Sequence, residues 1–99
     1  MTLTDKQRRF LRSLAHDLQP VIMIGNSGLT EGVARETERA LIDHELIKLK
    51  VRVGSREGRD EIVRQLAEKT LSGIVQRIGH VAVLYRARAD LPRIVIPDA

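Results

Sequence analysis

The sequence predicts an α/β fold, a compact α-β-α-β-α-β-β domain in which helices flank a four-stranded mixed sheet. Two observations lead to this prediction. Apolar residues recur at helical spacing in three segments, and four other segments are continuously apolar or alternate between apolar and polar residues. The first five segments alternate helix and strand, whereas the last two strands follow each other directly, which is typical of a hairpin.

The first helix is predicted to begin at Thr4-Asp5-Lys6-Gln7, a capping-box pattern. One side of this helix is apolar and is expected to face the core; it carries Leu3, Phe10, Leu11, Leu14 and Leu18. The other side is basic and presents Arg8, Arg9 and Arg12, with His16 in the same row. Pro20 cannot lie in a helix interior, so the helix should end before it.

The next strand, helix and strand follow from three different patterns. Residues 21–24 are apolar at every position, which predicts a strand covered on both faces. Thr30 is placed to cap the second helix. The inward stripe of that helix is predicted to be Val33, Thr37, Ala40, Leu41 and His44. Residues 46–53 then alternate, so one face should be buried and the other should be wet and basic; the basic side chains are Lys48, Lys50 and Arg52.

The last third of the chain is predicted to hold a helix and a hairpin. The helix should run from Glu57 to Leu71, with Gly73 as its C-terminal glycine cap. Residues 74–78 and 81–85 should pair across Gly79-His80. Pro92 and Pro97 bracket a short apolar stretch, residues 94–96, that we expect to form an edge strand.

Composition excludes several classes of function. The 99 residues contain no cysteine, and the three histidines show no ligand spacing, so we expect no metal, no cofactor and a reducing, cytoplasmic location. No apolar run is long enough to span a membrane. The net charge is +4, and residues 46–59 hold five basic side chains against one acidic side chain. Such clustering predicts a surface for a polyanion, although basic clusters are also often plain solvated surface.

The loop Gly25-Asn26-Ser27-Gly28 has several readings. It lacks the spacing and the lysine of a Walker loop, and it lacks the third glycine of a dinucleotide fingerprint. Two glycines with two residues between them resemble the backbone-clamping loop of KH domains, but that loop joins two helices. Alternatively, both glycines supply positive φ at a tight turn. Because the loop precedes a helix N-terminus, an anion could also bind there.

Three segments together closely resemble the YhbY-type CRM (chloroplast RNA splicing and ribosome maturation) domain family: LTDKQRRFLRSLAHDLQPVIMIGNSGLTEGV, ALIDHELIKLKV and IGHVAVLYR. The resemblance spans roughly residues 2–88. It implies a stand-alone bacterial-type RNA-binding module that associates with precursors of the large ribosomal subunit. It also implies a fold similar to the C-terminal domain of translation initiation factor 3. Residues 1–99 are then one CRM-type domain, with a tail at 89–99 that carries no assigned motif.

The leading hypothesis is a monomeric, cytoplasmic assembly factor that binds ribosomal RNA and performs no chemistry. The family's loop maps onto Gly25, Asn26, Ser27 and Gly28. The expected basic contacts are Arg8, Arg9, Arg12, Lys48, Lys50 and Arg52. With Phe10 and Tyr85 as its only aromatic residues, the chain should recognise backbone, shape and charge rather than stack bases. The alternatives are a module that docks on a ribosomal protein, and a small enzyme, for which no catalytic pair is found.

Overall fold

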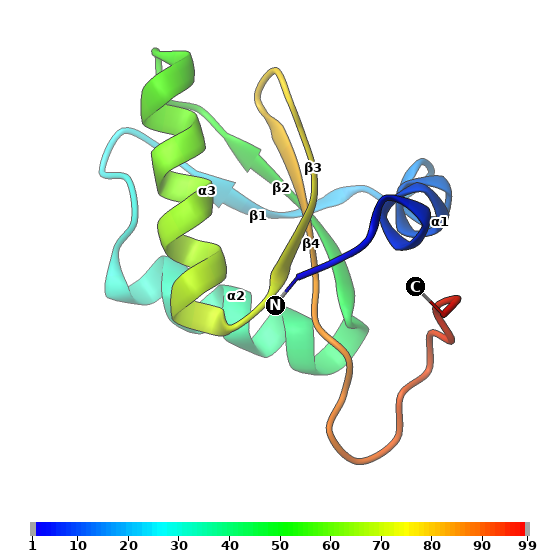
Figure 1. Ribbon diagram of the computed structural model, residues 1–99. Coiled ribbons are helices and arrows are strands. Elements are labelled where there is room, and N and C mark those ends of the chain that lie inside the picture. The colour runs from blue at the N-terminus through cyan, green and yellow to red at the C-terminus, as the bar shows by residue number, and fades with distance from the viewer. Residues whose placement is uncertain (1, 99) are drawn as a thin grey trace.

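The computed structural model describes residues 2–98 and has the predicted α/β architecture (Figure 1). Helices and strands alternate along the chain up to the final hairpin, and their bounds are α1 (Asp5–Ala15), β1 (Pro20–Ile24), α2 (Glu31–His44), β2 (Leu46–Val51), α3 (Arg56–Thr70), β3 (Gly73–Ile78) and β4 (Val81–Tyr85). The predicted order α-β-α-β-α-β-β and the final hairpin are therefore confirmed.

The four strands form one mixed sheet in the order β1-β2-β4-β3. β1 and β2 are parallel and are connected through α2, whereas β4 pairs antiparallel with both β2 and β3. Figure 1 shows α2 and α3 on one side of the sheet and α1 on the other side. The sheet is thus covered by two helices on one face and by a single helix on the opposite face.

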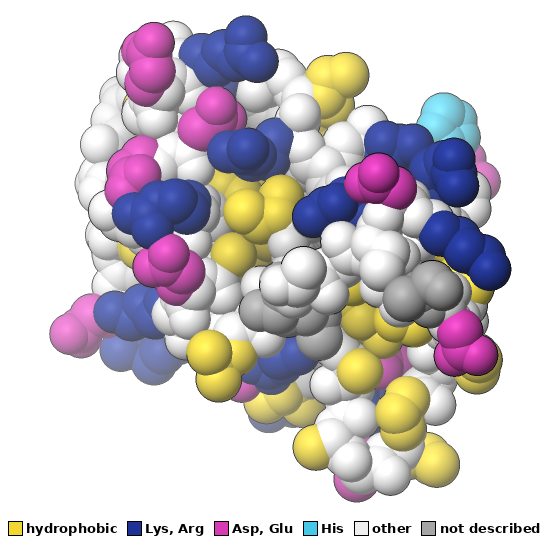
Figure 2. Space-filling view, in the orientation of Figure 1, with side chains coloured by type: hydrophobic (Ala, Val, Ile, Leu, Met, Phe, Trp, Pro, Cys, Tyr) yellow, Lys and Arg dark blue, Asp and Glu magenta, His cyan; other side chains and the backbone are white. Residues whose placement is uncertain are grey.

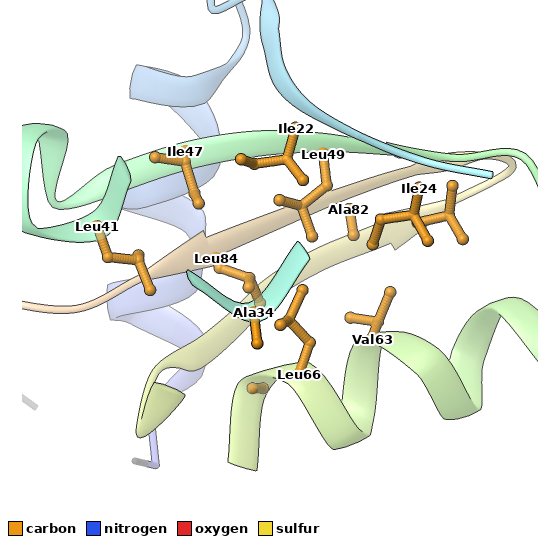
Figure 3. Packing of buried hydrophobic residues seen from close by; sticks show 12 residues of the cluster. Ile22, Ile24, Ala34, Leu41, Ile47, Leu49, Val63, Leu66, Ala82 and Leu84 are labelled. Atoms are coloured by element: carbon orange, nitrogen blue, oxygen red, sulfur yellow. The ribbon is translucent and has the colours of Figure 1, made fainter. Parts of the chain in front are cut away.

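The larger part of the core lies between the sheet and the helices α2 and α3 (Figure 3). Fully buried members of this cluster come from the sheet and from both helices; they include Ile24, Leu41, Leu49, Leu66 and Leu84. A smaller cluster lies under α1 and comprises Leu3, Leu11, Ala15, Leu46, Val75, Val83 and Tyr85.

Side-chain caps fix the beginnings of the helices, as expected. The Gln7 N–H donates to Thr4 Oγ1 at 3.1 Å and the Gln7 side chain accepts from the Thr4 N–H at 3.0 Å, which confirms the capping box. Thr30 Oγ1 likewise accepts from the N–H of Val33. The end of α3 was predicted wrongly: the left-handed residue is Leu71, with φ of 54°, and Gly73 begins β3.

The exposed face of β1 contradicts the prediction of a strand covered on both sides. Val21 and Met23 are 51% and 52% exposed, whereas the alternate residues Ile22 and Ile24 are buried. The reason is the reach of α1, which packs mainly over β2, β3 and β4 and leaves the edge strand β1 uncovered.

The apolar side of the first helix is also less buried than predicted. Leu11 is buried, but Leu14 and Leu18 are 43% and 37% exposed, and Phe10 is half-buried. The helix already ends at Ala15, so Leu18 belongs to the connection to β1. These two leucines therefore lie at the margin of the sheet rather than above its centre.

The junction of α2 and β2 differs from the prediction in its inward residue. His44 is exposed and Glu45 is fully buried, because the chain turns at Glu45 with φ of 63° and directs the carboxylate inward. The carboxylate accepts backbone N–H groups from Arg88 at 2.9 Å, Arg93 at 2.8 Å and Ile94 at 3.0 Å.

The tail forms no edge strand at residues 94–96. The N–H groups of Arg93 and Ile94 are instead occupied by the Glu45 carboxylate, and Ile94 and Ile96 pack against the cluster under α1. The Gln7 side chain holds the tail at a second point through the carbonyl oxygen of Pro97, at 3.1 Å. Proline-flanked apolar residues thus cover the core without pairing to the sheet.

Candidate nucleic-acid interface

The glycine loop is a tight turn between β1 and α2. The Gly28 N–H donates to the Gly25 carbonyl oxygen at 3.0 Å, and Asn26 and Ser27 are exposed at the tip. Gly28 has a φ of +68°, a left-handed conformation in which a side chain would be strained. The backbone geometry of the turn therefore explains the glycine at position 28.

Gly25 has no such explanation within the fold. Its φ lies outside the left-handed region, and a Cβ atom placed on it would meet no atom within 4 Å. The prediction that both glycines supply positive φ is therefore wrong for Gly25. What a glycine provides at this position is an exposed backbone that another molecule can approach without meeting a side chain.

Strand β2 extends from the glycine loop toward α1. Lys50 lies opposite Met23 of β1, and the Arg52 N–H donates to the Ile24 carbonyl oxygen at 2.7 Å. Arg52 is exposed and is thus placed beside the residue that precedes the loop. Lys48 lies at the other end of the series formed by Lys48, Lys50 and Arg52. Its Nζ donates to the His16 carbonyl oxygen at 3.5 Å.

The basic face of β2 is not the fully wet face that the alternation predicts. Leu46 on the same face is buried, and Lys48 and Lys50 are half-buried, because α1 packs against this side of the sheet. Lys48 also lies near the C-terminal end of α1, where a positive charge is favourable. It therefore stabilises the fold as well as adding positive potential.

A groove of about 820 Å³ separates α1 from the final hairpin; we call it the α1 groove. Its lining residues are Arg9, Arg12, Ser13, Ala15, His16, Lys48, Gln76, Ile78 and Val81. Within residues 2–98, the guanidinium groups of Arg9 and Arg12 form no ion pair or hydrogen bond to another side chain or to the backbone. Both groups remain available to an external anion.

Arg8 is separated from the other two arginines of α1. Its Nε donates to the Ile74 carbonyl oxygen at 3.3 Å, and its Nη1 lies 3.4 Å from Asp5 Oδ1. It borders a different hollow, which it shares with Arg64 and Leu71 of the α3 region. The structure thus places Arg9, Arg12 and Lys48 together and Arg52 beside the glycine loop, with Lys50 between these groups and Arg8 apart.

The surface view shows where charge gathers on this side of the molecule (Figure 2). Positive side chains occur over α1 on the right and over α3 on the left, and on the α3 side they alternate with acidic ones. Within α3, Arg64 forms ion pairs with both Glu61 and Glu68.

An apolar groove was missed by the sequence reasoning. It has a volume of about 410 Å³ and is lined by Leu14, Leu18, Gln19, Val21, His44, Leu46, Ile47, Lys48 and Ile94. The assignment of the two leucines and of Val21 to the core concealed it.

Among residues 2–98, no helix is long and apolar enough to cross a membrane.

Several known proteins resemble this chain in sequence. The sequence model of the CRS1 / YhbY (CRM) domain matches residues 3–86. A Haemophilus influenzae protein named as an RNA-binding protein is 50% identical over 96 residues, which cover 93% of this chain and 97% of the relative. The Bacillus subtilis probable RNA-binding protein YqeI is 36% identical over 95 residues, which cover 96% and 99% of the two chains.

A solved structure shows the same fold. The solution structure of the hypothetical protein SAV1595 from Staphylococcus aureus superimposes with a TM-score of 0.85 at 38% sequence identity. The match covers 97% of this chain and 100% of that chain. The overall fold of this chain therefore recurs in a protein with 38% sequence identity.

Proposed function

The chain belongs to the CRS1 / YhbY (CRM) domain family, and on that premise we propose that it binds ribosomal RNA in precursors of the large ribosomal subunit. Relatives that cover nearly the whole chain are named as RNA-binding proteins, which supports the RNA partner. In this proposal the protein is a non-enzymatic assembly factor. The glycine loop and the basic side chains of α1 and β2 hold the RNA backbone.

The observation that supports this proposal most strongly is the unexplained glycine at position 25. Neither φ nor packing requires a glycine there, so the fold would accept a side chain. A sugar-phosphate backbone that passes over Gly25 would be excluded by that side chain. The exposed Arg52 next to the loop supplies the positive charge that such a backbone needs.

The α1 groove extends the proposed contact. Arg9 and Arg12 offer guanidinium donors that have no partner among residues 2–98, and guanidinium groups match the geometry of phosphate oxygens. Base stacking contributes little, because Tyr85 is buried and Phe10 packs against the cluster under α1. Recognition in this proposal rests on the shape and charge of a folded RNA.

Filter binding of fragments of large-subunit ribosomal RNA tests the proposal. We expect retention above that of a small basic protein of equal net charge, with an affinity that falls steeply as salt increases. Equal retention of both proteins would refute specific RNA binding. Crosslinking in cells, followed by sequencing of the attached RNA, should recover large-subunit ribosomal RNA; recovery of other RNAs alone would refute that target.

The apolar groove favours a second candidate function, docking on a ribosomal protein. Leu14, Leu18 and Val21 are exposed side by side along it, and such surfaces often mark protein contacts. The same filter assay separates the two functions, because a protein that docks only on another protein would retain no naked RNA above the charge-matched control.

A further inference from the structure

A second concentration of positive charge lies beside the turn between β3 and β4. Arg56 is the first residue of α3, Arg59 follows one turn later, and Arg77 stands near the end of β3. Together with Asp60, Ile78 and Gly79 they line a cleft of about 370 Å³, which we call the arginine cleft. Ile78 also lines the α1 groove, so the two basic surfaces flank the same strand end.

Charge in the arginine cleft is only partly neutralised. Asp60 is the one acidic residue of its lining, and Asp60 Oδ1 lies 3.5 Å from Arg77 Nη1. Within residues 2–98, the Arg56 side chain takes part in no ion pair. Arg56 also stands at the N-terminal end of a helix, where the helix dipole disfavours a positive charge. An anion in the cleft would relieve both unfavourable interactions.

Arg59 is held in position by the backbone. Its Nη1 donates to the carbonyl oxygens of Val53 at 2.9 Å and Gly54 at 3.1 Å, which anchors one side of the guanidinium group. Its Nε is buried and has no hydrogen-bond partner in the part of the chain that the structure describes. Because Nε is enclosed, an external acceptor would bind the remaining N–H groups of this anchored guanidinium, which loses little further freedom on binding.

We propose that the arginine cleft binds a backbone phosphate of the RNA, as a contact separate from the glycine loop and the α1 groove. This inference rests on the proposed function. Phosphate oxygens match the donors of several converging arginines better than a single carboxylate does. Because Ile78 is shared, an RNA that crosses the β3–β4 turn can contact the α1 groove on one side and the arginine cleft on the other.

The test compares two double variants of equal charge. Arg56→Gln with Arg77→Gln removes the outer charges of the cleft and leaves Arg59, whose loss would leave the Val53 and Gly54 carbonyls without their donor. The control, Arg39→Gln with Lys69→Gln, removes two exposed charges from α2 and from the opposite end of α3. Both are titrated with a large-subunit ribosomal RNA fragment over a range of KCl concentrations, and thermal melts confirm folding.

We expect the cleft variant to flatten the slope of log K against log salt by about 0.7 to 0.9, the value for one lost phosphate contact, and the control to keep the wild-type slope. Equal slopes for the two variants would overturn the arginine cleft and leave RNA binding itself intact. A wild-type protein that does not retain the RNA at all would overturn both the cleft and the proposed function.

Discussion

The two faces of the sheet are covered to very different extents. On one face, α2 and α3 bury an apolar cluster that reaches from β1 to β3, with Ile24, Leu49 and Leu84 fully enclosed. On the other face, α1 alone covers the centre, and Val21 and Met23 of β1 remain half exposed. The covered face buries the larger part of the core, and the open face carries the apolar groove and the α1 groove.

Because of this difference, neighbouring residues of β2 have different roles: some stabilise the fold, and others face the surface that we propose binds RNA. In β2, Leu49 points into the covered face, whereas its neighbours Lys48 and Lys50 point into the open face. Substitutions in adjacent residues should therefore affect different measurements. The open face has a structural anchor of its own, since the tail that closes its margin is held by the buried carboxylate of Glu45.

The largest effect is expected on the covered face. Leu49→Ala removes a fully buried side chain and leaves a cavity, which should lower the free energy of unfolding by about 2 to 5 kcal/mol. Met23→Ala, on the open face of β1, should change it by about 0.5 kcal/mol or less. Urea unfolding measures both. Similar losses in the two variants would show that the faces do not differ as described.

Glu45→Gln should have the next largest effect. The variant keeps one acceptor oxygen for three backbone N–H groups of the tail, so the free energy of unfolding should fall by about 1.5 to 3 kcal/mol. Hydrogen exchange should also increase at Arg88, Arg93 and Ile94. If the variant were as stable as the wild type although its tail amides exchanged rapidly, the tail would not be needed for the stability of the cluster under α1.

The effect of Glu45→Gln should depend on pH. Burial alone would raise the pKa of Glu45, but the N–H donors of Arg88, Arg93 and Ile94 outweigh burial and hold this pKa below its ordinary value of 4.5. The stabilisation is therefore complete above pH 4.5 and is lost as the pH falls through the lower pKa of the folded state. The difference in the free energy of unfolding between wild type and Glu45→Gln should therefore narrow below pH 4.5. A difference that stays constant with pH would contradict this explanation.

The smallest effect on stability is expected for the basic groups of the open face whose side chains form no hydrogen bond or ion pair within residues 2–98. Arg9→Gln, Arg12→Gln and Lys50→Gln together should change the free energy of unfolding by less than about 1 kcal/mol. If each group contacts a phosphate, the slope of log K against log salt should flatten by roughly 2. Arg8 and Lys48 are left unchanged because both donate hydrogen bonds within the protein.

The matched control removes three charges from the helices of the covered face, through Arg39→Gln, Arg64→Gln and Lys69→Gln. Arg39 and Arg64 pair with carboxylates on their own helices. This variant should keep the slope of the wild type. If both triple variants flatten the slope equally, RNA binding is general electrostatics and the open face has no special part in it.

The sequence predicted the elements of the fold well because their signals are local. The Thr4–Gln7 capping box and the alternation of residues 47–51 involve only neighbours in the chain, and the structure has both. The burial of whole faces was predicted less well. Whether Val21 is covered depends on how far α1 extends over the sheet, which no local pattern of β1 contains.

The candidate site was predicted as a set of residues but not as an arrangement. Helical spacing grouped Arg8 with Arg12, yet a carbonyl of β3 holds Arg8 outside the α1 groove. The arginine cleft joins Arg59 to Arg77 across 18 positions of the sequence, and charge counting along the chain cannot detect such a pair. The buried role of Glu45 was hidden for the same reason, since its partners lie in the tail.

The most direct test of the central claim, that RNA contacts the open backbone of the glycine loop, is a pair of variants at Gly25. Because φ and space both accept a side chain, Gly25→Ala should leave the fold as stable as the wild type or up to about 1 kcal/mol more stable. Gly25→Glu should also remain folded. We predict that RNA binding weakens in Gly25→Ala and weakens further in Gly25→Glu, where a negative charge faces the phosphates. A folded Gly25→Glu protein that binds RNA as tightly as the wild type would contradict the account and reduce the loop to a turn.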